Sequence, residues 1–170
     1  IIACVIISIG VQMFQNSQLK SLLSIAVVDS NYNHDEQVEA LQNDFLAYAG
    51  TGDKHEVVDV DTSLLSGDDY NAVVKMTVVM GAGTADMMFC GEETYKKYKQ
   101  QEAFLSWKEV LGDDYSKYEE YMTDDGRLDL EKCPNWEKYN MVYYSPVYAV
   151  VMSSSKNLEN CIKFLEMMVQ

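Results

Sequence analysis

The stretch from Tyr70 to Trp107 constrains the fold more than any other part of the chain. Its first part has apolar positions at helical spacing and ends in Gly81-Ala82-Gly83, where glycines predict the end of a helix. The apolar run Met87 to Cys90 predicts a short buried strand, and the acidic start at Glu92 predicts another helix. A strand leading directly into a helix places backbone N–H donors where open α/β sheets bind ligands.

One strand–helix unit and a second strand precede this stretch. The run Leu22 to Asp29 (LLSIAVVD) is typical of a strand buried on both faces. The loop that follows leads into a helix for which Asn33 is the expected N-cap and Gly50 the stop. A second strand is expected from His55 to Val60.

The next helix is expected to be capped within Ser66-Gly67-Asp68. Its apolar positions keep helical spacing at Val73, Val74, Thr77 and Val78. The resulting order, β-α-β-α-β-α, predicts an α/β fold with a mostly parallel sheet between two layers of helices, a three-layer sandwich.

The second half of the chain is less regular. Trp107–Leu111 is followed by Gly112-Asp113-Asp114 and then by an expected tyrosine-rich helix at Tyr115–Met122, and the segment Thr123–Pro134 is polar and turn-forming. One or two strands are expected within Met141–Ser153, interrupted at Pro146. A last helix is expected from about Asn157, with an apolar face made of Leu158, Cys161, Ile162, Leu165 and Met168.

The chain has the length of about one domain, and it opens in an apolar run, IIACVIISIGVQMF. Three interpretations compete for residues 1–14: the end of a transmembrane helix, a signal peptide, or a buried core helix. Ile1 to Cys4 also resembles a bacterial lipobox, although apolar residues follow the cysteine. We favour a single-pass transmembrane anchor at 1–14, a linker at 15–21, and one domain at 22–170.

Composition excludes several classes of function. With 13 basic and 27 acidic residues, the formal net charge is −14, which disfavours nucleic acid and anionic lipid as partners of the main surface. The four cysteines include no CxxC pair, so neither a zinc ribbon nor a thioredoxin-like redox site is expected.

No catalytic or metal-binding motif stands out. His34 and His55 are the only histidines, and neither lies in a recognisable nucleophile motif. The cluster Asp124-Asp125-Gly126 does not fit a calcium loop, because Tyr121 and Lys132 would occupy positions that require carboxylates. We therefore expect no enzyme activity, no cofactor and no metal; a hydrolase assembled from distant residues is the disfavoured alternative.

An aromatic set lies in the last third of the chain. These side chains either pack in the core or an interface, or stack on a ligand. The set is Trp136, Tyr139, Tyr143, Tyr144 and Tyr148.

Residues 22–111 and 141–169 together resemble the first lobe of a type 2 extracellular solute-binding protein. Thr84-Ala85-Asp86 with MMFC is similar to that family's acidic step before a short apolar strand. Val110 to Asp114 is a loose counterpart of a later family segment, and Ser155-Lys156-Asn157 with Phe164-Leu165 is similar to its terminal helix. The resemblance implies a single solute-binding lobe.

The resemblance lacks one part of the family pattern. In the family a second lobe precedes the terminal strand, and the ligand is trapped between the lobes. Here only Tyr115 to Asn140 separates the matching segments, which is too short for a lobe. Closure of two lobes on a ligand is therefore not expected.

These observations predict a membrane-anchored, extracytoplasmic accessory domain of a membrane transport complex, an ABC transporter. The expected partners are permease subunits or another copy of the chain, with a small solute or peptide as a possible ligand. The loops after the first and third strands should meet that ligand through Asn31, Tyr32, Asn33, Gly91, Glu92 and Glu93. The alternative is a structural protein that assembles through its sheet edge or aromatic surface without a small ligand.

Overall fold

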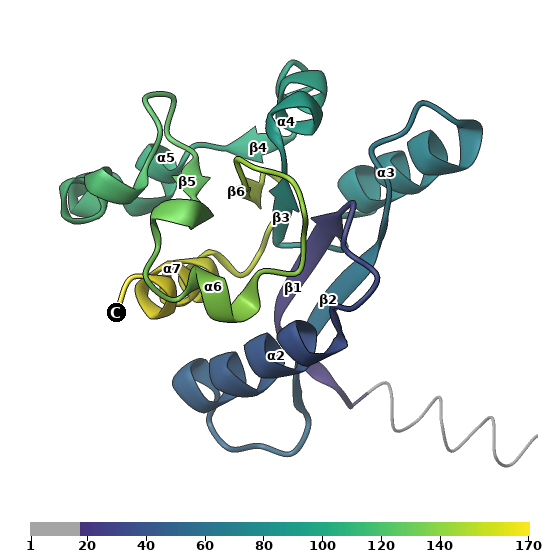
Figure 1. Cartoon of the computed structure of the whole chain (residues 1–170). Coiled ribbons are helices and arrows are strands. Elements are labelled where there is room, and N and C mark those ends of the chain that lie inside the picture. Colours follow the sequence, from purple (N-terminus) through teal and green to yellow (C-terminus); the bar gives the residue numbers. More distant parts are fainter. Residues whose placement is uncertain (1–17) are drawn as a thin grey trace, which may run out of the picture.

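Strand β1, Lys20–Val28, lies inside the sheet, between β2 and β3, in the computed structural model, which describes residues 18–170 (Figure 1). It pairs in parallel with β2, Glu56–Leu64, and with β3, Met87–Cys90. The buried residues of β1 divide between two clusters, one containing Leu23, Ile25 and Val27 and the other Ala26 and Val28. Burial on both faces explains the continuous apolar run of this strand.

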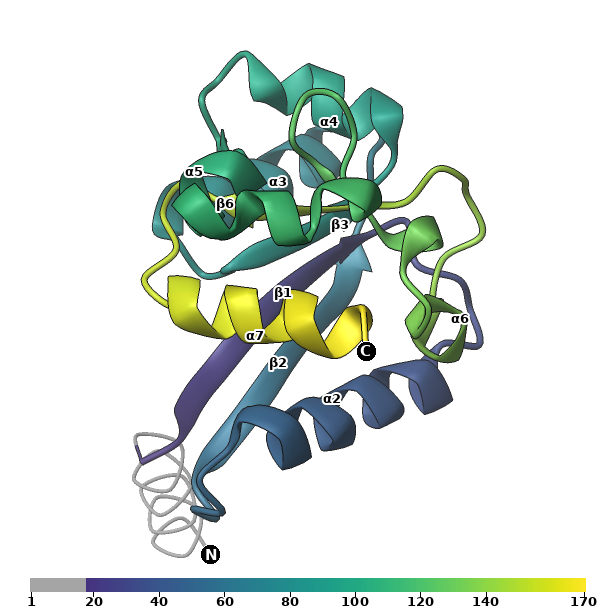
Figure 2. The same ribbon diagram turned by 90° about the vertical axis from the view of Figure 1, so that its left-hand side faces the viewer.

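Helices cover both faces of the sheet, as predicted. One face carries α2 (Asp35–Ala49), α5 (Trp107–Leu111), α6 (Trp136–Tyr139) and α7 (Leu158–Met168). Figure 2 looks onto this face, with α7 and α2 in front of the strands. The opposite face carries α3 (Tyr70–Ala82) and α4 (Glu92–Lys99).

The sheet is mixed, with the strand order β2-β1-β3-β6-β4. Strand β6, Tyr148–Met152, runs antiparallel to β3, to β4 (Phe104–Leu105) and to β5 (Leu128–Asp129). The prediction of a mostly parallel sheet therefore holds only for β2, β1 and β3. The chain enters β6 from the edge at which β1 and β3 end, without a helical crossover, so β6 runs in the opposite direction.

The predicted helix Tyr115–Met122 is wrong. The chain instead forms two 3₁₀ helices, η1 (Gly112–Lys117) and η2 (Glu119–Tyr121), followed after β5 by η3 (Leu130–Lys132). Backbone bonds of 3.0 Å join Tyr118 N to Tyr115 O and Tyr121 N to Tyr118 O. A 3₁₀ helix aligns every third residue, which lets all three tyrosines pack against the core.

Two helix starts differ from the prediction by one residue. His34, not Asn33, is the N-cap of α2, and Asp69 is the N-cap of α3. Strand β1 begins at Lys20, inside the segment 15–21 that was predicted as a linker. The predicted end of α3 is confirmed, because Gly83 adopts a left-handed conformation with φ 61°.

The buried face of α3 is not the one that the spacing of its valines suggested. Ala72, Met76 and Val79 face the sheet, and the predicted positions Val73, Val74, Thr77 and Val78 are exposed. On α7, Cys161, Leu165 and Met168 are buried as predicted, whereas Leu158 is exposed and Ile162 half-buried. The sheet selects the helix face that it covers, and spacing alone does not identify that face.

The predicted transmembrane anchor at 1–14 lies outside the described residues. Within residues 18–170, no helix has the length and apolarity needed to cross a membrane. The described cysteines, Cys90, Cys133 and Cys161, are free and buried, and burial raises the pKa of each thiol to about 12.

Candidate functional site

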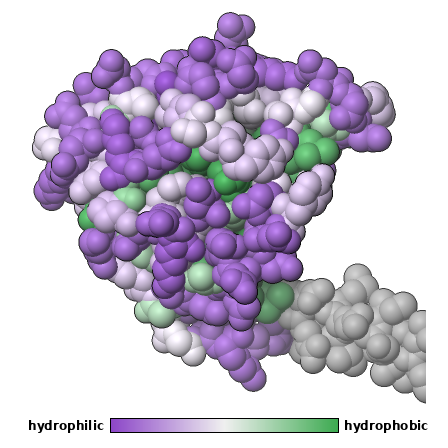
Figure 3. Space-filling view, in the orientation of Figure 1, coloured by the Kyte–Doolittle hydropathy of each residue, from purple (hydrophilic) through white to green (hydrophobic). Residues whose placement is uncertain are grey.

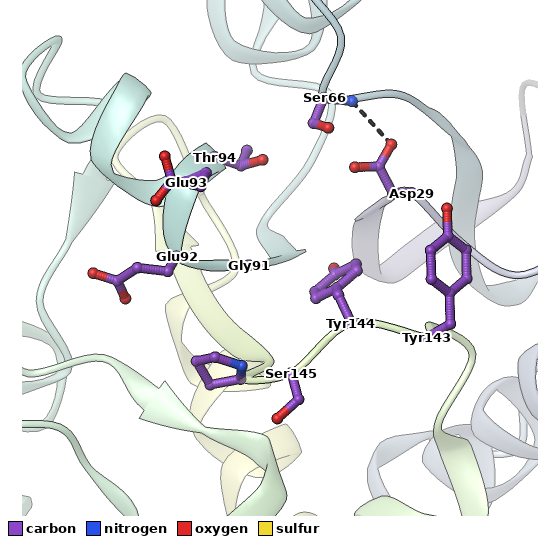
Figure 4. Close-up of a pocket in the computed structure, with 10 residues that line it drawn as sticks. Asp29, Ser66, Gly91, Glu92, Glu93, Thr94, Tyr143, Tyr144 and Ser145 are labelled. Carbon is purple, nitrogen blue, oxygen red and sulfur yellow. Dashed lines mark hydrogen bonds between the residues drawn. The ribbon is translucent and has the colours of Figure 1, made fainter.

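A hollow lies at the edge of the sheet where β1 and β3 end. Because these strands are parallel neighbours, Asp29 after β1 and Gly91 after β3 reach the same edge. The segment that leads into β6 forms the opposite wall, and the hollow measures about 280 Å³ (Figure 4). Its lining consists of Asp29, Ser66, Gly91, Glu92, Glu93, Thr94, Tyr143, Tyr144, Ser145 and Pro146.

Asp29 ends β1 with a left-handed backbone, φ 51°, a conformation that Asp tolerates better than most residues. Its N–H donates to Leu64 O at 2.9 Å, and its Oδ1 accepts from Ser66 N at 3.0 Å. These two bonds hold the carboxylate between the end of β1 and the loop after β2. Strand β1 therefore places the carboxylate of Asp29, held by these bonds, at the hollow.

The N-terminus of α4 forms the second wall. The first-turn N–H groups of a helix have no intrahelical acceptor, and the N-cap Gly91 has no side chain to satisfy them. In Figure 4 the side chains of Glu92 and Glu93 extend away from Asp29 and Tyr143. The backbone donors of this turn and the Thr94 side chain are thus the polar groups that α4 offers to the hollow.

Gly91 also has a packing role. A Cβ at this position would lie 3.2 Å from Cδ2 of Tyr144, tighter than ordinary van der Waals contact. The tyrosine ring therefore packs directly on the backbone at the start of α4. This close approach explains the glycine between β3 and α4.

Two tyrosines form the aromatic wall. Tyr143 is 74% exposed, whereas Tyr144 is half-buried. The Tyr144 hydroxyl is buried without a hydrogen-bond partner among the described residues, and burial raises the pKa of this phenol above its usual range. A cis peptide bond, Ser145–Pro146, carries the chain from this wall into β6.

The start of α4 is held by Arg127. Its Nη1 donates to Glu92 Oε2 at 2.5 Å and its Nε to Asp125 Oδ1 at 2.8 Å. Its guanidinium carbon lies 4.3 Å from the ring centroid of Tyr95 and 4.0 Å from that of Tyr148. The bond from Arg127 lowers the pKa of Glu92, so this glutamate is a charged structural partner near the hollow.

The structure brings together half of the predicted site. Gly91 and Glu92 line the hollow, together with Glu93. Asn31, Tyr32 and Asn33 do not line it: Asn31 N donates to Met141 O, and Tyr32 is fully exposed. The chain turns away after Asp29, so the first residue after β1 lines the hollow and the three that were predicted do not.

Sequence reasoning missed seven lining residues, among them Asp29, Ser66, Tyr143 and Tyr144. Asp29 had a visible signal, because it closes the apolar run of the first strand. Tyr143 and Tyr144 belonged to the aromatic set, whose other members, Trp136, Tyr139 and Tyr148, are buried. Ser66 had no signal, because only the tertiary structure brings its N–H to Asp29.

Neither histidine lies at the hollow. His34 Nε2 lies 2.8 Å from Thr62 Oγ1, and His55 Nδ1 lies 2.9 Å from Asp53 Oδ1. Among residues 18–170, no group of three or more His, Cys, Asp or Glu side chains is placed to hold a metal ion. The hollow offers hydrogen-bond donors, a carboxylate and aromatic surface, which suit binding of a small polar molecule.

Comparisons with family models, with curated proteins and with solved structures found no match to this chain. The resemblance to solute-binding proteins thus stays a prediction from sequence.

Proposed function

We propose that the chain is a non-enzymatic, solute-binding-like accessory domain of an ABC-type membrane transport complex. The apolar segment 1–14 anchors it as a single-pass protein, with residues 22–170 outside the cytoplasm. The single observation that best supports this proposal is the hollow between Asp29, the start of α4 and the Tyr143–Pro146 wall. It lies at the carboxyl ends of β1 and β3, where open α/β sheets bind ligands.

The chemistry of the hollow favours a small solute or peptide that carries both charges. The uncapped first turn of α4 attracts a carboxylate, because its N–H groups and the helix dipole favour negative charge. Asp29 can accept hydrogen bonds from an ammonium group, and Tyr143 offers an exposed ring for apolar contact. At about 280 Å³ the hollow is small for a ligand site, which favours an amino acid or dipeptide.

The binding test is a thermal-shift and calorimetric screen of the full chain against amino acids and dipeptides. We expect at least one compound to raise the melting temperature and to lose affinity tenfold or more in Asp29→Asn and in Tyr143→Ala. Tyr32→Ala is the matched control, since Tyr32 is an exposed tyrosine outside the hollow. Stabilisation unaffected by both hollow variants would refute the site.

Localisation is tested separately in intact cells. We expect the full chain to fractionate with membranes and its domain to be cleaved by externally added protease. Recovery of the chain in the cytoplasmic fraction would contradict the anchored, extracytoplasmic placement.

The second candidate is a protein that assembles without a small ligand. It is favoured by exposed apolar side chains on the surface, including Leu65, Tyr70 and Val78. The sheet edge that the sequence suggested for assembly is partly occupied: Gln42 Nε2 and Ser30 Oγ donate to the β2 carbonyls of Val58 and Thr62. Such bonds reduce the capacity of an edge strand to pair with another chain.

A further inference from the structure

Strand β4 forms one edge of the sheet. The strand order β2-β1-β3-β6-β4 gives β4 a single neighbour in that order, β6. At the opposite edge, side-chain donors already occupy the β2 carbonyls of Val58 and Thr62. An edge whose backbone groups are not occupied in this way can pair with another extended chain.

Two hydrogen bonds fix the direction in which the backbone of Phe104 points. Ser153 N donates to Ala103 O at 2.9 Å, so Ala103 directs its carbonyl toward the chain of β6. Met152, which lies opposite Phe104 on β6, instead donates to Asp86 O at 2.8 Å, on the side of β3. Because successive residues of a strand direct their backbone groups to opposite sides, the N–H and C=O of Phe104 point away from β6. Neither group has a hydrogen-bond partner among residues 18–170.

A cavity of about 510 Å³ borders this edge, and we call it the β4 cavity. Phe104 and Leu105 line it together with Tyr95, whose ring stacks on that of Phe104 at a centroid distance of 5.6 Å. A second cavity of about 260 Å³ shares Glu102 and Ser153 with it and extends past the start of β4. The hollowed surface thus follows the strand along its length, as an extended ligand requires.

The β4 cavity carries negative charge that its own lining does not neutralise. The lysine of the lining, Lys99, is paired with Asp125 at 3.1 Å. Glu109 accepts hydrogen bonds from the uncharged N–H and hydroxyl of Ser106. Neither Glu109 nor Glu102 forms an ion pair within the described part of the chain. A basic side chain placed in this cavity would complement both carboxylates.

Charge alone would not select this cavity, because the chain has a net charge of −14 and the surface visible in Figure 3 is largely hydrophilic. The backbone of Phe104 is selective, since its donor and acceptor match the acceptor and donor of one residue in an extended chain. That residue would place its side chain on the same face as Phe104, beside the ring of Tyr95. Lys99 lies 5.3 Å from this ring, so the face favours an apolar side chain with basic residues on either side of it.

We propose that the free edge of β4 binds an extended peptide segment that pairs antiparallel with Phe104 and places a basic side chain in the β4 cavity. Two backbone hydrogen bonds and one or two ion pairs make a small interface, so the binding is weak. This inference is independent of ligand binding at the hollow, because the hollow and the β4 cavity share no lining residue.

The first test titrates the full chain with the acetylated and amidated peptide Gly-Lys-Val-Lys-Gly, up to about 2 mM, and measures the heat of binding. We expect saturable binding that is lost when both lysines of the peptide are replaced by glutamate. Methylation of the valine nitrogen should weaken binding tenfold or more, because it removes the donor to Phe104 O. Methylation of the nitrogen of the first lysine is the matched control, since this N–H faces away from β4, and it should change the affinity less than threefold.

The second test changes the charge of the β4 cavity. Glu102→Lys should weaken peptide binding fivefold or more without lowering the melting temperature, because Glu102 is exposed and forms no ion pair in the described residues. Glu39→Lys is the matched control, an exposed glutamate on α2, which covers the other face of the sheet.

Four results would overturn the proposal. They are the absence of binding by the unmodified peptide, equal binding of the valine-methylated peptide, binding that is indifferent to Glu102→Lys, and loss of binding in Asp29→Asn. The last result would place the peptide in the hollow, since Asp29 lines the hollow and not the β4 cavity.

Discussion

Arg127 is the only arginine of the chain, and its side chain is 11% exposed. It lies between the rings of Tyr95 and Tyr148 and is bonded to Glu92 and Asp125. Burial acts to lower the pKa of this guanidinium, but the bonds from the two carboxylates outweigh that effect and raise it. Arg127 thus joins the start of α4 to the turn before β5 through contacts that only a planar, forked cation can make.

Replacement of Arg127 should lower the free energy of unfolding, and by more for alanine than for lysine. Arg127→Ala leaves Glu92 and Asp125 without their shared partner and empties the space between the rings, so we expect a loss of about 3 kcal/mol. Arg127→Lys keeps the charge but loses the fork and the stacking, for a loss of about 1–2 kcal/mol. Urea denaturation measures both; the exposed Lys117→Ala is the control without measurable effect. Equal stability of all three variants would contradict this role.

Asp125 makes the stability depend on acid. Burial acts to raise the pKa of Asp125, but hydrogen bonds from Thr123, Arg127 and Lys99 outweigh it and lower the pKa to about 2. An unfolded Asp has a pKa of about 3.9. The depressed value stabilises the folded state above about pH 3.9, and this contribution is lost as the pH falls through about 2.

We therefore expect the melting temperature of the wild-type chain to fall between pH 4 and pH 2. Asp125→Asn should be less stable than wild type at pH 6 and should show a shallower fall, because its amide does not titrate. Thermal denaturation at several pH values measures the slopes. Parallel curves for the two proteins would argue against a contribution of Asp125.

Asp86 connects two segments that are far apart in the sequence. Its Oδ2 accepts from Ser24 N at 3.0 Å and from Asn157 Nδ2 at 3.1 Å, and its Oδ1 accepts from Ser155 Oγ at 2.8 Å. Two of the segments that suggested a family resemblance thus meet at this carboxylate. They meet at the start of β3, the edge opposite to the hollow, where their role is structural.

At the scale of elements, the predictions that rest on neighbouring residues were the most accurate. Strand β3 begins and ends where the sequence predicts, and helix α4 begins at the predicted Glu92. Helix α5 begins with a capping box in which Ser106 and Glu109 satisfy each other's backbone N–H groups. Local hydrogen bonds of this kind depend on neighbouring residues, so the sequence carries them directly.

The cap of α3 provides a test at this scale. Asp69 Oδ1 accepts from Asn71 N at 3.0 Å and from Ala72 N at 3.1 Å. Asp69→Ala removes both bonds and should cost about 1 kcal/mol, whereas Asp69→Asn keeps an acceptor and should cost less than about 0.5 kcal/mol. Urea denaturation measures both variants. An Asn variant as unstable as the Ala variant would assign the effect to charge instead of capping.

At the scale of the whole molecule, the segment Tyr115–Asn140 is part of the core. This short stretch packs against the rest of the domain. Its buried side chains join the cluster beneath α2 and α7: Met122, Leu128, Leu130, Cys133, Trp136 and Tyr139. Asp44 of α2 accepts a hydrogen bond from the Tyr139 hydroxyl at 2.6 Å, which ties α6 to α2.

Replacement of this segment by a glycine–serine linker should abolish cooperative unfolding, because it uncovers one face of the sheet and removes β5. Near-UV circular dichroism and urea denaturation measure the loss. The control inserts the same linker between Gly52 and Asp53, an exposed loop, and should unfold cooperatively. A cooperative transition in the replaced protein would show that the segment is dispensable.

The sequence by itself determined most of the local elements, apart from the 3₁₀ helices at 112–121, and it determined that helices cover both faces of the sheet, because apolar periodicity and capping act between near neighbours. It also indicated the carboxyl edge of β1 and β3 as the candidate site, since parallel strands end together. Only the tertiary structure decided that β6 runs antiparallel and that Asp29 and the Tyr143–Tyr144 wall replace Asn31, Tyr32 and Asn33. These features depend on contacts between distant segments. Such contacts set the direction of each strand and the face that each helix buries.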